Sequence, residues 1–508
     1  DTDELNSVVQ LSNGDVVAIG SSRSGISGDK DDTYRAQEDY WIVCMDAALN
    51  VKWQKTIGGD SIDIPQVVIQ TNDGNILCAG YSNSSVSFDK TAANKGGYDY
   101  WIIKLDTSGN ELWQKTYGGA GDDYATDLKE LNDGSLLISG HSDSEIGGDK
   151  SDSSRGYADY WLVKIDFMGN ILWDKTFGGS GVDYWPKLAV TSAGEIVLSG
   201  NTTSPVSGDK TEPLYGLVSI WVLKLNDSGN YLWDKCLGGE NSQFGGIGGA
   251  VNGWGIPVVI NTDIFILGNS DSDSTGTKTE NSKGDTDYWI TKLNANGGIV
   301  WDKTIGGISN DGGTSLLVSS AGELLLSGSS LSGVSGDKED PMIGNSDFWI
   351  VAIDTTGVIQ WQKTIGGTDF ETLAQTIETE PGKFLIAGYS ESGADGDKTE
   401  PSRGQEDYWI VELSLPTGIP QGEEQVISFF PFPNPSLGTL NIQLPHNYQG
   451  DYKLRVYDAA GKIIMSDQII GSTPIVSTNM SENGMYFVQL IDKTDRVVAA
   501  TKIIIQHP

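Results

Sequence analysis

The side chains that most often carry acid–base or metal chemistry are scarce in this sequence. Histidine occurs only at His141, His446 and His507. A zinc or copper centre built from several histidines is therefore excluded from residues 1–414. A Ser-His-Asp triad in that region would rest on His141 alone, and no Gly-x-Ser-x-Gly motif surrounds it.

Carboxylates are abundant, and a pair of them could serve a glycosidase or a lyase. However, Asp63, Asp123 and Asp183 recur sixty residues apart, and the capping of a repeated turn explains them more simply. The sequence therefore predicts no catalytic residue. The alternative to a protein without catalysis is a secreted polysaccharide-active or quinoprotein-like enzyme.

Two acidic stretches offer the hard oxygen ligands that calcium prefers, "GDKDD" at 28–32 and "DSDS" at 271–274. Neither stretch matches an EF-hand loop, and solvated acidic loops are the simpler interpretation. No metal site and no cofactor are predicted, with calcium left as an open alternative.

The overall charge restricts the partners. The 69 acidic and 33 basic residues give a formal net charge of -36, which argues against a nucleic-acid partner. No run of eighteen apolar residues occurs, so no transmembrane helix is expected. We also find no basic segment followed by an apolar one at Asp1, and hence expect no export signal within this sequence. Cys44, Cys78 and Cys236 fall in three different repeats, which does not suggest a disulfide framework or a metal cluster.

The dominant feature is a repeat marked by tryptophan. The "DYW" tryptophan or its equivalent occurs at 41, 101, 161, 221, 289, 349 and 409, and a second tryptophan follows at 53, 113, 173, 233, 301 and 361. Each unit contains four strand-like runs and no helical periodicity, and "DYWIIKL" at 99–105 is apolar on both faces. Strands of this kind belong in sheets that are covered on both sides. We predict an all-β protein whose residues 1–414 form a seven-bladed β-propeller of about 60-residue repeats, with tryptophans wedged between blades.

Two details of the repeat lead to specific expectations. The hairpin turn starts at an aspartate such as Asp106 and has Gly109 three residues later, so Leu49 at the glycine position should loosen the first turn. Lysine precedes the "DYW" aspartate by nine residues, which we interpret as a Lys–Asp contact that fixes the long loop. These lysines are Lys30, Lys90, Lys150, Lys210, Lys278, Lys338 and Lys398, and the aspartates are Asp39, Asp99, Asp159, Asp287, Asp347 and Asp407, with Ser219 as the exception.

The copies of the strands are unequal in number. Seven copies of the first three strands occur, but only six of the "WxKTxGG" strand. Asp3 precedes Gly20 by seventeen residues, as Asp63 precedes Gly80. We therefore expect the seventh copy of this strand to lie upstream of Asp1 or to be replaced by a later segment. Unit four carries an irregular glycine-rich stretch at 241–258, which is either a tolerated insertion or a binding loop.

A different pattern follows the repeats. Residues 415–428 resemble a linker, and 429–508 contain short alternating strands that predict a small Ig-like β-sandwich. Within them, "FPFPNPSLGTLNIQLP", "VYDAAGKII", "SENGMYFVQLID" and "TKIIIQ" occur in order. This module resembles the type A C-terminal sorting domain of type IX secretion cargo. The family's shared residues correspond to Pro433, Asn434, Pro435, Asp458, Gly461, Lys462, Gly484, Tyr486 and Lys502.

The resemblance implies a route for the protein. Cargo of this family crosses the outer membrane of Gram-negative bacteria through a translocon, where an outer-membrane shuttle barrel commonly recognises the sorting domain. We therefore expect an extracellular or cell-surface protein whose propeller binds a surface glycan or a protein, for adhesion and without catalysis. Neither the ligand nor the biological process, such as gliding, attachment or nutrient capture, can be predicted from these residues.

Overall fold

The computed structural model describes two compact units, Asp1–Ser414 and Leu415–Pro508. The residues it describes are 1–240, 255–415, 430–432, 439–443, 452–458, 462–469, 475–479, 484–491 and 497–505. All regular structure within them is β-strand. These residues accordingly include no helix that could cross a membrane.

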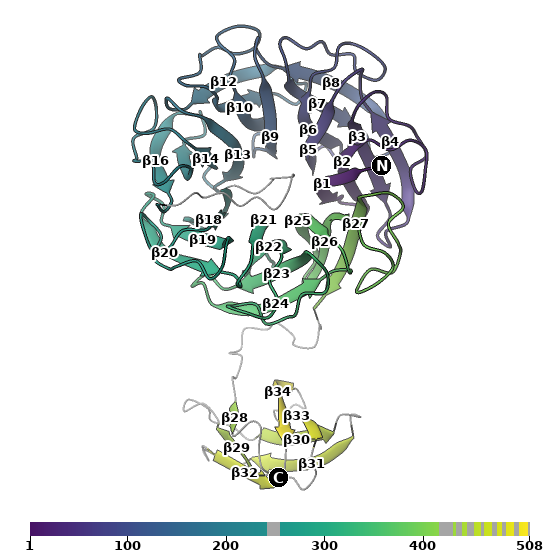
Figure 1. The fold of residues 1–508 in the computed structure, drawn as a ribbon, viewed down its shortest axis with the longest axis vertical. Helices are drawn as coiled ribbons and strands as arrows, with labels where there is room; N and C mark the ends of the chain where they lie inside the picture. Colours follow the sequence, from purple (N-terminus) through teal and green to yellow (C-terminus); the bar gives the residue numbers. More distant parts are fainter. Residues whose placement is uncertain are drawn as a thin grey trace. The chain divides into compact units, whose positions relative to one another are not determined.

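The first unit is a ring of seven antiparallel sheets (Figure 1), which confirms the predicted seven-bladed propeller. The innermost strands are β1 (Asp3–Gln10), β5 (Asp63–Gln70), β9 (Asp123–Glu130), β13 (Asp183–Val190), β17 (Ile256–Ile260), β21 (Asp311–Val318) and β25 (Glu371–Glu380). The second strands are β2 (Val16–Ser22), β6 (Ile76–Ser82), β10 (Leu136–Ser142), β14 (Ile196–Thr202), β18 (Asp263–Ser270), β22 (Leu324–Ser330) and β26 (Lys383–Ser390).

The "DYW" strands come third in each blade and the "WxKTxGG" strands come fourth, on the outer rim. The third strands are β3 (Asp39–Met45), β7 (Asp99–Leu105), β11 (Asp159–Ile165), β15 (Ser219–Leu225), β19 (Asp287–Leu293), β23 (Asp347–Ile353) and β27 (Asp407–Ser414). The fourth strands are β4 (Val51–Ile57), β8 (Glu111–Tyr117), β12 (Ile171–Phe177), β16 (Tyr231–Leu237), β20 (Ile299–Ile305) and β24 (Ile359–Ile365). Blade seven is β25-β26-β27, without a fourth strand in the described part of the chain.

The third strands form the core between blades. Every residue of β7 is buried, because neighbouring sheets cover both of its faces. Trp101 packs among Val17, Ile19 and Ile42 of the preceding blade, and its ring lies 5.0 Å from that of Tyr40. The hydroxyl of Tyr40 donates a hydrogen bond to the Trp101 carbonyl at 3.2 Å. The predicted wedging of tryptophan between blades is confirmed.

The second tryptophan explains the glycine of the hairpin turn. Gly109 has φ +79°, and an added Cβ would lie 3.1 Å from the ring of Trp53 on the preceding blade. Glycine is therefore required both by the left-handed backbone and by this packing. The expectation for Leu49 is wrong, because its N–H still bonds the Asp46 carbonyl at 2.9 Å. Leu49 adopts φ +62°, at a cost of about 1–2 kcal/mol.

The predicted Lys–Asp contact is also wrong. All fourteen residues of the pattern are described, and no ion pair joins the lysines to the aspartates. Lys90 is buried and donates to the Ala92 carbonyl at 3.0 Å and to Asn94, and its ammonium lies over the Trp101 ring. The Asp99 carboxylate instead accepts the backbone N–H of Lys95. The ammonium and the carboxylate therefore bind different groups of the loop and not one another.

The recurrent acid at the start of each inner strand is structural, as expected. Asp63 is fully buried, and its Oδ2 accepts the Gly59 N–H at 2.6 Å and the Ser84 hydroxyl at 2.8 Å. The equivalent bonds recur at Asp123, Asp183, Asp311 and Glu371. These carboxylates anchor the crossing from one blade to the next.

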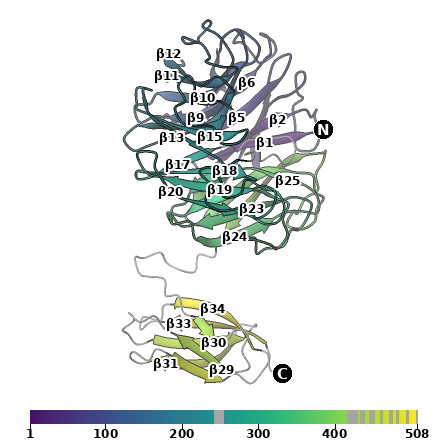
Figure 2. The ribbon, with the colours of Figure 1, turned by 60° about the vertical axis from the view of Figure 1, so that its left-hand side comes forward.

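The second unit contains two antiparallel sheets (Figure 2). One consists of β28 (Phe430–Phe432), β29 (Thr439–Gln443) and β32 (Ile475–Asn479). The other has the order β31-β30-β33-β34, with β30 (Tyr452–Asp458), β31 (Ile463–Ile469), β33 (Gly484–Ile491) and β34 (Val497–Ile505). The short alternating strands expected in this module are present, and the Ig-like sandwich stays a prediction.

Candidate functional site

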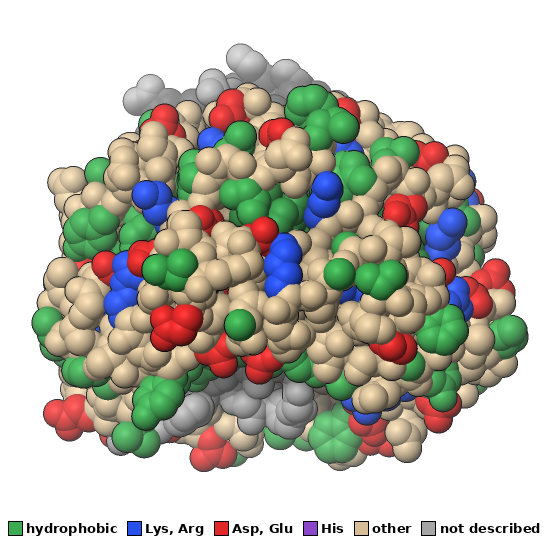
Figure 3. Space-filling model, turned by 90° about the horizontal axis from the view of Figure 1, so that it is seen from above, with side chains coloured by type: hydrophobic (Ala, Val, Ile, Leu, Met, Phe, Trp, Pro, Cys, Tyr) green, Lys and Arg blue, Asp and Glu red, His purple; other side chains and the backbone are tan. Residues whose placement is uncertain are grey.

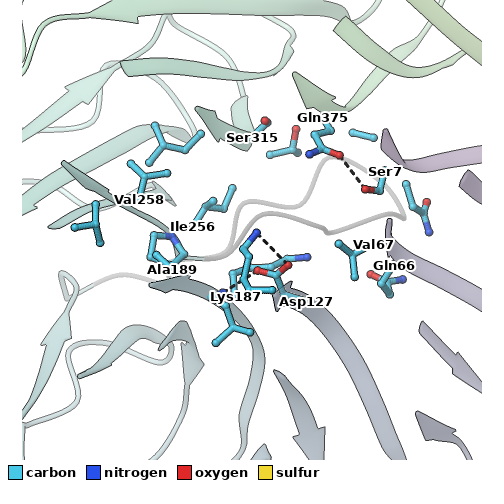
Figure 4. A pocket seen from close by; sticks show the side chains of 18 residues that line it. Ser7, Gln66, Val67, Asp127, Lys187, Ala189, Ile256, Val258, Ser315 and Gln375 are labelled. Atoms are coloured by element: carbon cyan, nitrogen blue, oxygen red, sulfur yellow. Dashed lines mark hydrogen bonds and ion pairs between the residues drawn. The ribbon is translucent and has the colours of Figure 1, made fainter. Parts of the chain in front are cut away.

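The inner strands of the propeller surround a cavity of about 320 Å³ in the central channel (Figure 4). Its lining includes Ser7, Gln66, Asp127, Lys187 and Gln375, which come from five different blades. A channel of this kind is the usual first candidate for a ligand site in a ring-shaped fold.

Most of these polar groups are nevertheless engaged between blades. Asp127 Oδ2 accepts the Leu188 N–H at 2.8 Å, and Ser7 Oγ accepts the Val68 N–H at 3.2 Å. Lys187 Nζ donates to the Thr126 carbonyl at 2.6 Å, and burial lowers the pKa of its ammonium. The channel lining therefore serves chiefly to hold the inner strands together.

A second candidate is a cluster of aromatic side chains on blades two to four, which we call the aromatic cluster. It consists of Tyr81, Tyr98, Tyr124, His141, Tyr184 and Trp185. None of these residues was predicted as a site from the sequence, although the repeat contains a signal for them. At the position of Tyr98 the other units have Glu, Ala, Val, Thr or Ser, so this ring departs from the repeat.

The rings of the cluster pack against one another in a continuous series. The Tyr98 and Tyr124 centroids lie 5.1 Å apart at 31°, and His141 stacks on Tyr124 at 5.0 Å and 19°. Trp185 extends the series, with its ring 5.2 Å from His141. Tyr98, Tyr124, His141 and Trp185 are all half-buried, so each of them keeps part of its surface accessible to solvent.

His141 contributes an uncharged aromatic ring to the cluster. Burial lowers the pKa of its imidazole to about 3, so it is neutral at physiological pH. Its Nδ1 accepts a hydrogen bond from the backbone N–H of Trp185 at 3.4 Å. Trp185 itself has φ +54°, at the register shift between β13 and β14. A left-handed tryptophan is a strained conformation of the type that gathers at functional sites.

Carboxylates border the aromatic cluster. A pocket of about 210 Å³ is lined by Tyr124, His141 and Tyr184 together with Asp122 and Asp143. Asp122 Oδ1 accepts the Tyr98 N–H at 2.9 Å, and Asp143 is exposed. The pocket thus combines half-buried aromatic side chains with two carboxylates.

Acidic groups also lie near Tyr81, whose pKa is raised by burial and then by Glu38, neighbouring tyrosines and Glu4. The pKa of Glu4 is raised to about 7 by burial and by the nearby charges of Glu406 and Glu38. Elsewhere the negative charge is spread out. Figure 3 shows acidic side chains distributed over one face, among hydrophobic and basic ones.

In the first of the two stretches considered for calcium, two aspartates form ion pairs. Asp29 pairs with Arg403, and Asp32 pairs with Arg35 at 3.0 Å. In the described segments no group of three or more His, Cys, Asp or Glu side chains could hold a metal ion. Cys44, Cys78 and Cys236 are buried free thiols. Of the irregular stretch in unit four, residues 241–254 lie outside the described residues.

The predicted sorting residues are only partly described. Pro433, Asn434, Pro435 and Gly461 lie outside the described residues. Asp458 ends β30 directly opposite Tyr486 of β33, and Tyr486 is buried. Gly484 begins β33, Lys502 lies in β34 opposite Phe487, and Lys462 is exposed just before β31. The structure therefore places Asp458, Gly484, Tyr486 and Lys502 in one sheet.

Residues 431–506 match the family described as the secretion system C-terminal sorting domain. The regulatory protein FlaEY of Caulobacter vibrioides is 21% identical over 426 residues, which cover 77% of this chain and 43% of that protein. The chain thus spans less than half the length of this relative.

The similar solved structures include a protein of unknown function from Dyadobacter fermentans, with a TM-score of 0.40 and 12% identity over 82% of this chain and 95% of that chain. Another is PorZ, a bacterial surface component of the type-IX secretion system of Porphyromonas gingivalis, with a TM-score of 0.26 and 10% identity over 98% of this chain and 74% of that chain. Taken with its sheets and its terminal match, the chain is a seven-bladed β-propeller that carries a type IX secretion C-terminal sorting domain and is exported to the cell surface or the extracellular space.

Proposed function

We propose that the exported propeller is a non-catalytic binding module and that it recognises a carbohydrate at the aromatic cluster. The observation that carries the proposal is the convergence of six aromatic rings from blades two, three and four at positions where the repeat does not require them. Repeated residues are explained by the blade, whereas departures from the repeat need another reason.

A carbohydrate fits the chemistry of this cluster. One face of a sugar ring carries mainly C–H groups and packs against an aromatic face, while its hydroxyls need hydrogen-bond partners at the edge. Tyr124 and His141 supply stacked rings, and Asp122 and Asp143 supply acceptors beside them. The pocket of about 210 Å³ is open on one side, which suits a unit within a longer chain.

Two features support binding without catalysis. His141, the sole histidine of the propeller, has its pKa lowered to about 3 by burial, and a general base should have a pKa near the working pH. Asp122 is already an acceptor for the Tyr98 N–H. The alternative of a polysaccharide-active enzyme would need a second carboxylate placed as acid or nucleophile.

Export supplies the setting for such binding. We infer that the sorting domain is recognised by the outer-membrane translocon and its shuttle barrel. The residues that correspond to the family's shared ones and lie in one sheet, Asp458, Gly484, Tyr486 and Lys502, would make this contact. Attachment to a surface glycan, that is adhesion, would then be the role of the propeller outside the cell.

A glycan array probed with residues 1–414 tests the proposal. We expect binding to a restricted set of glycans, and we expect the Tyr124→Ala variant to lose at least tenfold in affinity. Phe167→Ala is the matched control, because Phe167 is an exposed aromatic side chain in a rim turn. If thermal melting shows that wild type and Tyr124→Ala are both folded and the two bind equally well, the assignment of the site is refuted.

A further inference from the structure

The pocket of the aromatic cluster is lined by charged groups of one sign only. Its described lining consists of Asp122, Tyr124, His141, Asp143, Ala158, Val182 and Tyr184. Two of these side chains are carboxylates, which are ordinarily ionised at neutral pH, and none of them is Lys or Arg. The histidine does not offset them, because burial lowers the pKa of its imidazole to about 3. The pocket therefore carries negative charge without a cation in its own described lining.

The tyrosines of the cluster respond to the same negative charge. Burial raises the pKa of Tyr124, and Asp122, Tyr98 and Asp143 raise it further. Burial also raises the pKa of Tyr98, and the charge of Asp122 is the next cause. Both phenols therefore stay neutral beside the carboxylates and do not change the sign of the charge at the pocket.

Two lysines on the same segments as the cluster are engaged elsewhere. Lys95 lies in the loop that leads to Tyr98, and its ammonium pairs with Asp149. Lys187 lies in the same strand as Trp185 and donates to a backbone carbonyl at 2.6 Å. Neither lysine lines the pocket, so the described chain does not neutralise its carboxylates through them.

The fold does not require the charge of Asp143. Its Oδ1 accepts the Asp122 N–H at 2.6 Å. In the two adjacent blades Asn83 and Thr203 accept the equivalent backbone N–H, at 2.9 Å and 2.8 Å. A neutral oxygen therefore suffices for this bond, and the charge of Asp143 needs another reason.

Asp122 also departs from the repeat. The corresponding residues of other units are Thr2, Ile62, Val182, Asn310 and Phe370. The carboxylate of Asp122 accepts the Tyr98 N–H at 2.9 Å, and the oxygen of an amide side chain can make the same bond. Asp122 is half-buried and Asp143 is exposed. Two charges that backbone hydrogen bonding does not need thus meet at one pocket.

This arrangement favours one sign of ligand charge. An ammonium group gains charge-assisted hydrogen bonds to carboxylate oxygens and is also attracted to aromatic rings. A carboxylate, sulfate or phosphate group would meet like charge at the pocket and, at longer range, a chain of net charge -36. A neutral hydroxyl can bind the same oxygens but gains less from them.

We propose that the aromatic cluster selects a sugar that carries a protonated amino group and rejects acidic sugars. The inference rests on the proposed function, because it specifies which class of carbohydrate the pocket binds. The ammonium of the sugar binds Asp122 and Asp143, and the sugar ring packs against the half-buried aromatic side chains.

A glycan array probed with the full chain tests this selection. The array presents each backbone in four forms, with a free amino group, an N-acetylamino group, a hydroxyl group or a carboxylate. We expect the free-amino form of the bound backbone to bind about fivefold more tightly than its N-acetylated form, because a hydrogen bond to a charged group is the stronger one. The carboxylate form should bind most weakly.

Two substitutions assign the preference to the pocket. Asp122→Asn and Asp143→Asn each keep an oxygen acceptor but remove one charge, and each should lower the ratio of the two affinities about threefold or more. Asp227→Asn removes the same charge from an exposed turn between β15 and β16 and should leave the ratio unchanged. This control separates the pocket from the general attraction of cations to an acidic chain.

Two results would overturn the inference while carbohydrate recognition stands. The first is a neutral or acidic form that binds as tightly as the free-amino form. The second is a ratio that falls equally in Asp227→Asn and in the two pocket variants, or that does not fall in either pocket variant. Binding to no glycan on the array would instead overturn the proposed function, and the inference with it.

Discussion

Gln375 of the last blade accepts a hydrogen bond from the hydroxyl of Ser7 in the first blade, at 2.9 Å. The same Oε1 accepts the Val8 N–H, also at 2.9 Å. Other neighbouring blades use the same device, as where Ser315 Oγ accepts the Thr376 N–H at 3.1 Å. Together with the bond from the Tyr408 hydroxyl to the Trp41 carbonyl at 3.1 Å, these contacts close the ring although blade seven has three described strands.

Replacement of Gln375 should weaken this closure. Gln375→Ala leaves the Val8 N–H without its acceptor in a part-buried site, which should lower the free energy of unfolding by about 1–3 kcal/mol. Denaturant unfolding measures the loss. Gln360→Ala, at an exposed position on β24, is the control and should change stability by less than about 0.5 kcal/mol. Equal effects of the two changes would contradict the role of Gln375.

Two glycines separate backbone strain from packing. Gly109 and Gly74 both have positive φ, but an added Cβ meets Trp53 at the first position and nothing within 4 Å at the second. Gly74→Ala should therefore cost about 1–2 kcal/mol from the left-handed backbone. Gly109→Ala should cost about 1–3 kcal/mol more, because Trp53 must move. Thermal and denaturant melts of the two variants check this, and similar losses would show that Trp53 does not constrain the turn.

Buried carboxyl groups predict an unusual pH dependence. Burial raises the pKa of Asp159 to about 7, with a further contribution from Asp183, while the Arg155 N–H and the nearby Lys150 act in the opposite direction. The pKa is thus higher in the folded state than the unfolded value of about 3.9. Between pH 4 and pH 7 the folded state binds more protons, so the free energy of unfolding should fall as the pH rises.

Melting temperatures at pH 5 and pH 7.5 measure this effect, and the higher value is expected at pH 5. Asp159→Asn should reduce the difference, because the amide does not ionise, whereas Asp31→Asn at an exposed position should leave it unchanged. A wild-type protein that is more stable at pH 7.5, or an unaltered difference in Asp159→Asn, would be inconsistent with this assignment.

Two substitutions of His141 test whether glycan binding depends on the aromatic ring or on its nitrogens. If the imidazole serves as an uncharged ring stacked on Tyr124, His141→Phe should retain glycan binding within about threefold, and His141→Ala should lose most of it. Aromatic contacts of this kind contribute about 0.5–1.5 kcal/mol each. Equal loss in both variants, measured with the glycan selected on the array, would indicate that the ring nitrogens are essential.

The blades could be predicted from the repeat, because the residue pattern of every unit fits one sheet that is covered on both faces. Trp101 and Gly109 could be assigned from spacing, since each recurs wherever its structural task recurs. The contacts of Lys90 could not be predicted in the same way. A constant spacing between lysine and aspartate shows that both matter to the loop, but it does not show whether they bind one another or the loop backbone.

The aromatic cluster was harder to predict, because most of its residues do not recur from one repeat to the next. Tyr124 and His141 lie seventeen residues apart on neighbouring strands of one blade, while Tyr98 and Trp185 come from the adjacent blades. Tyr124 and His141 are paired across the β9–β10 hairpin, whereas the contacts of Tyr98 and Trp185 with them follow from the packing of adjacent blades.

The most direct test of an exported binding propeller is the location of the chain with and without its last module. Cells that produce the full chain and cells that produce residues 1–428 can be compared by fractionation and by protease accessibility at the intact surface. We predict that the full chain reaches the surface or the medium and that the truncated chain stays in the periplasm, folded as judged by its resistance to proteolysis. Delivery of the truncated propeller to the surface at the full-length level would contradict the account.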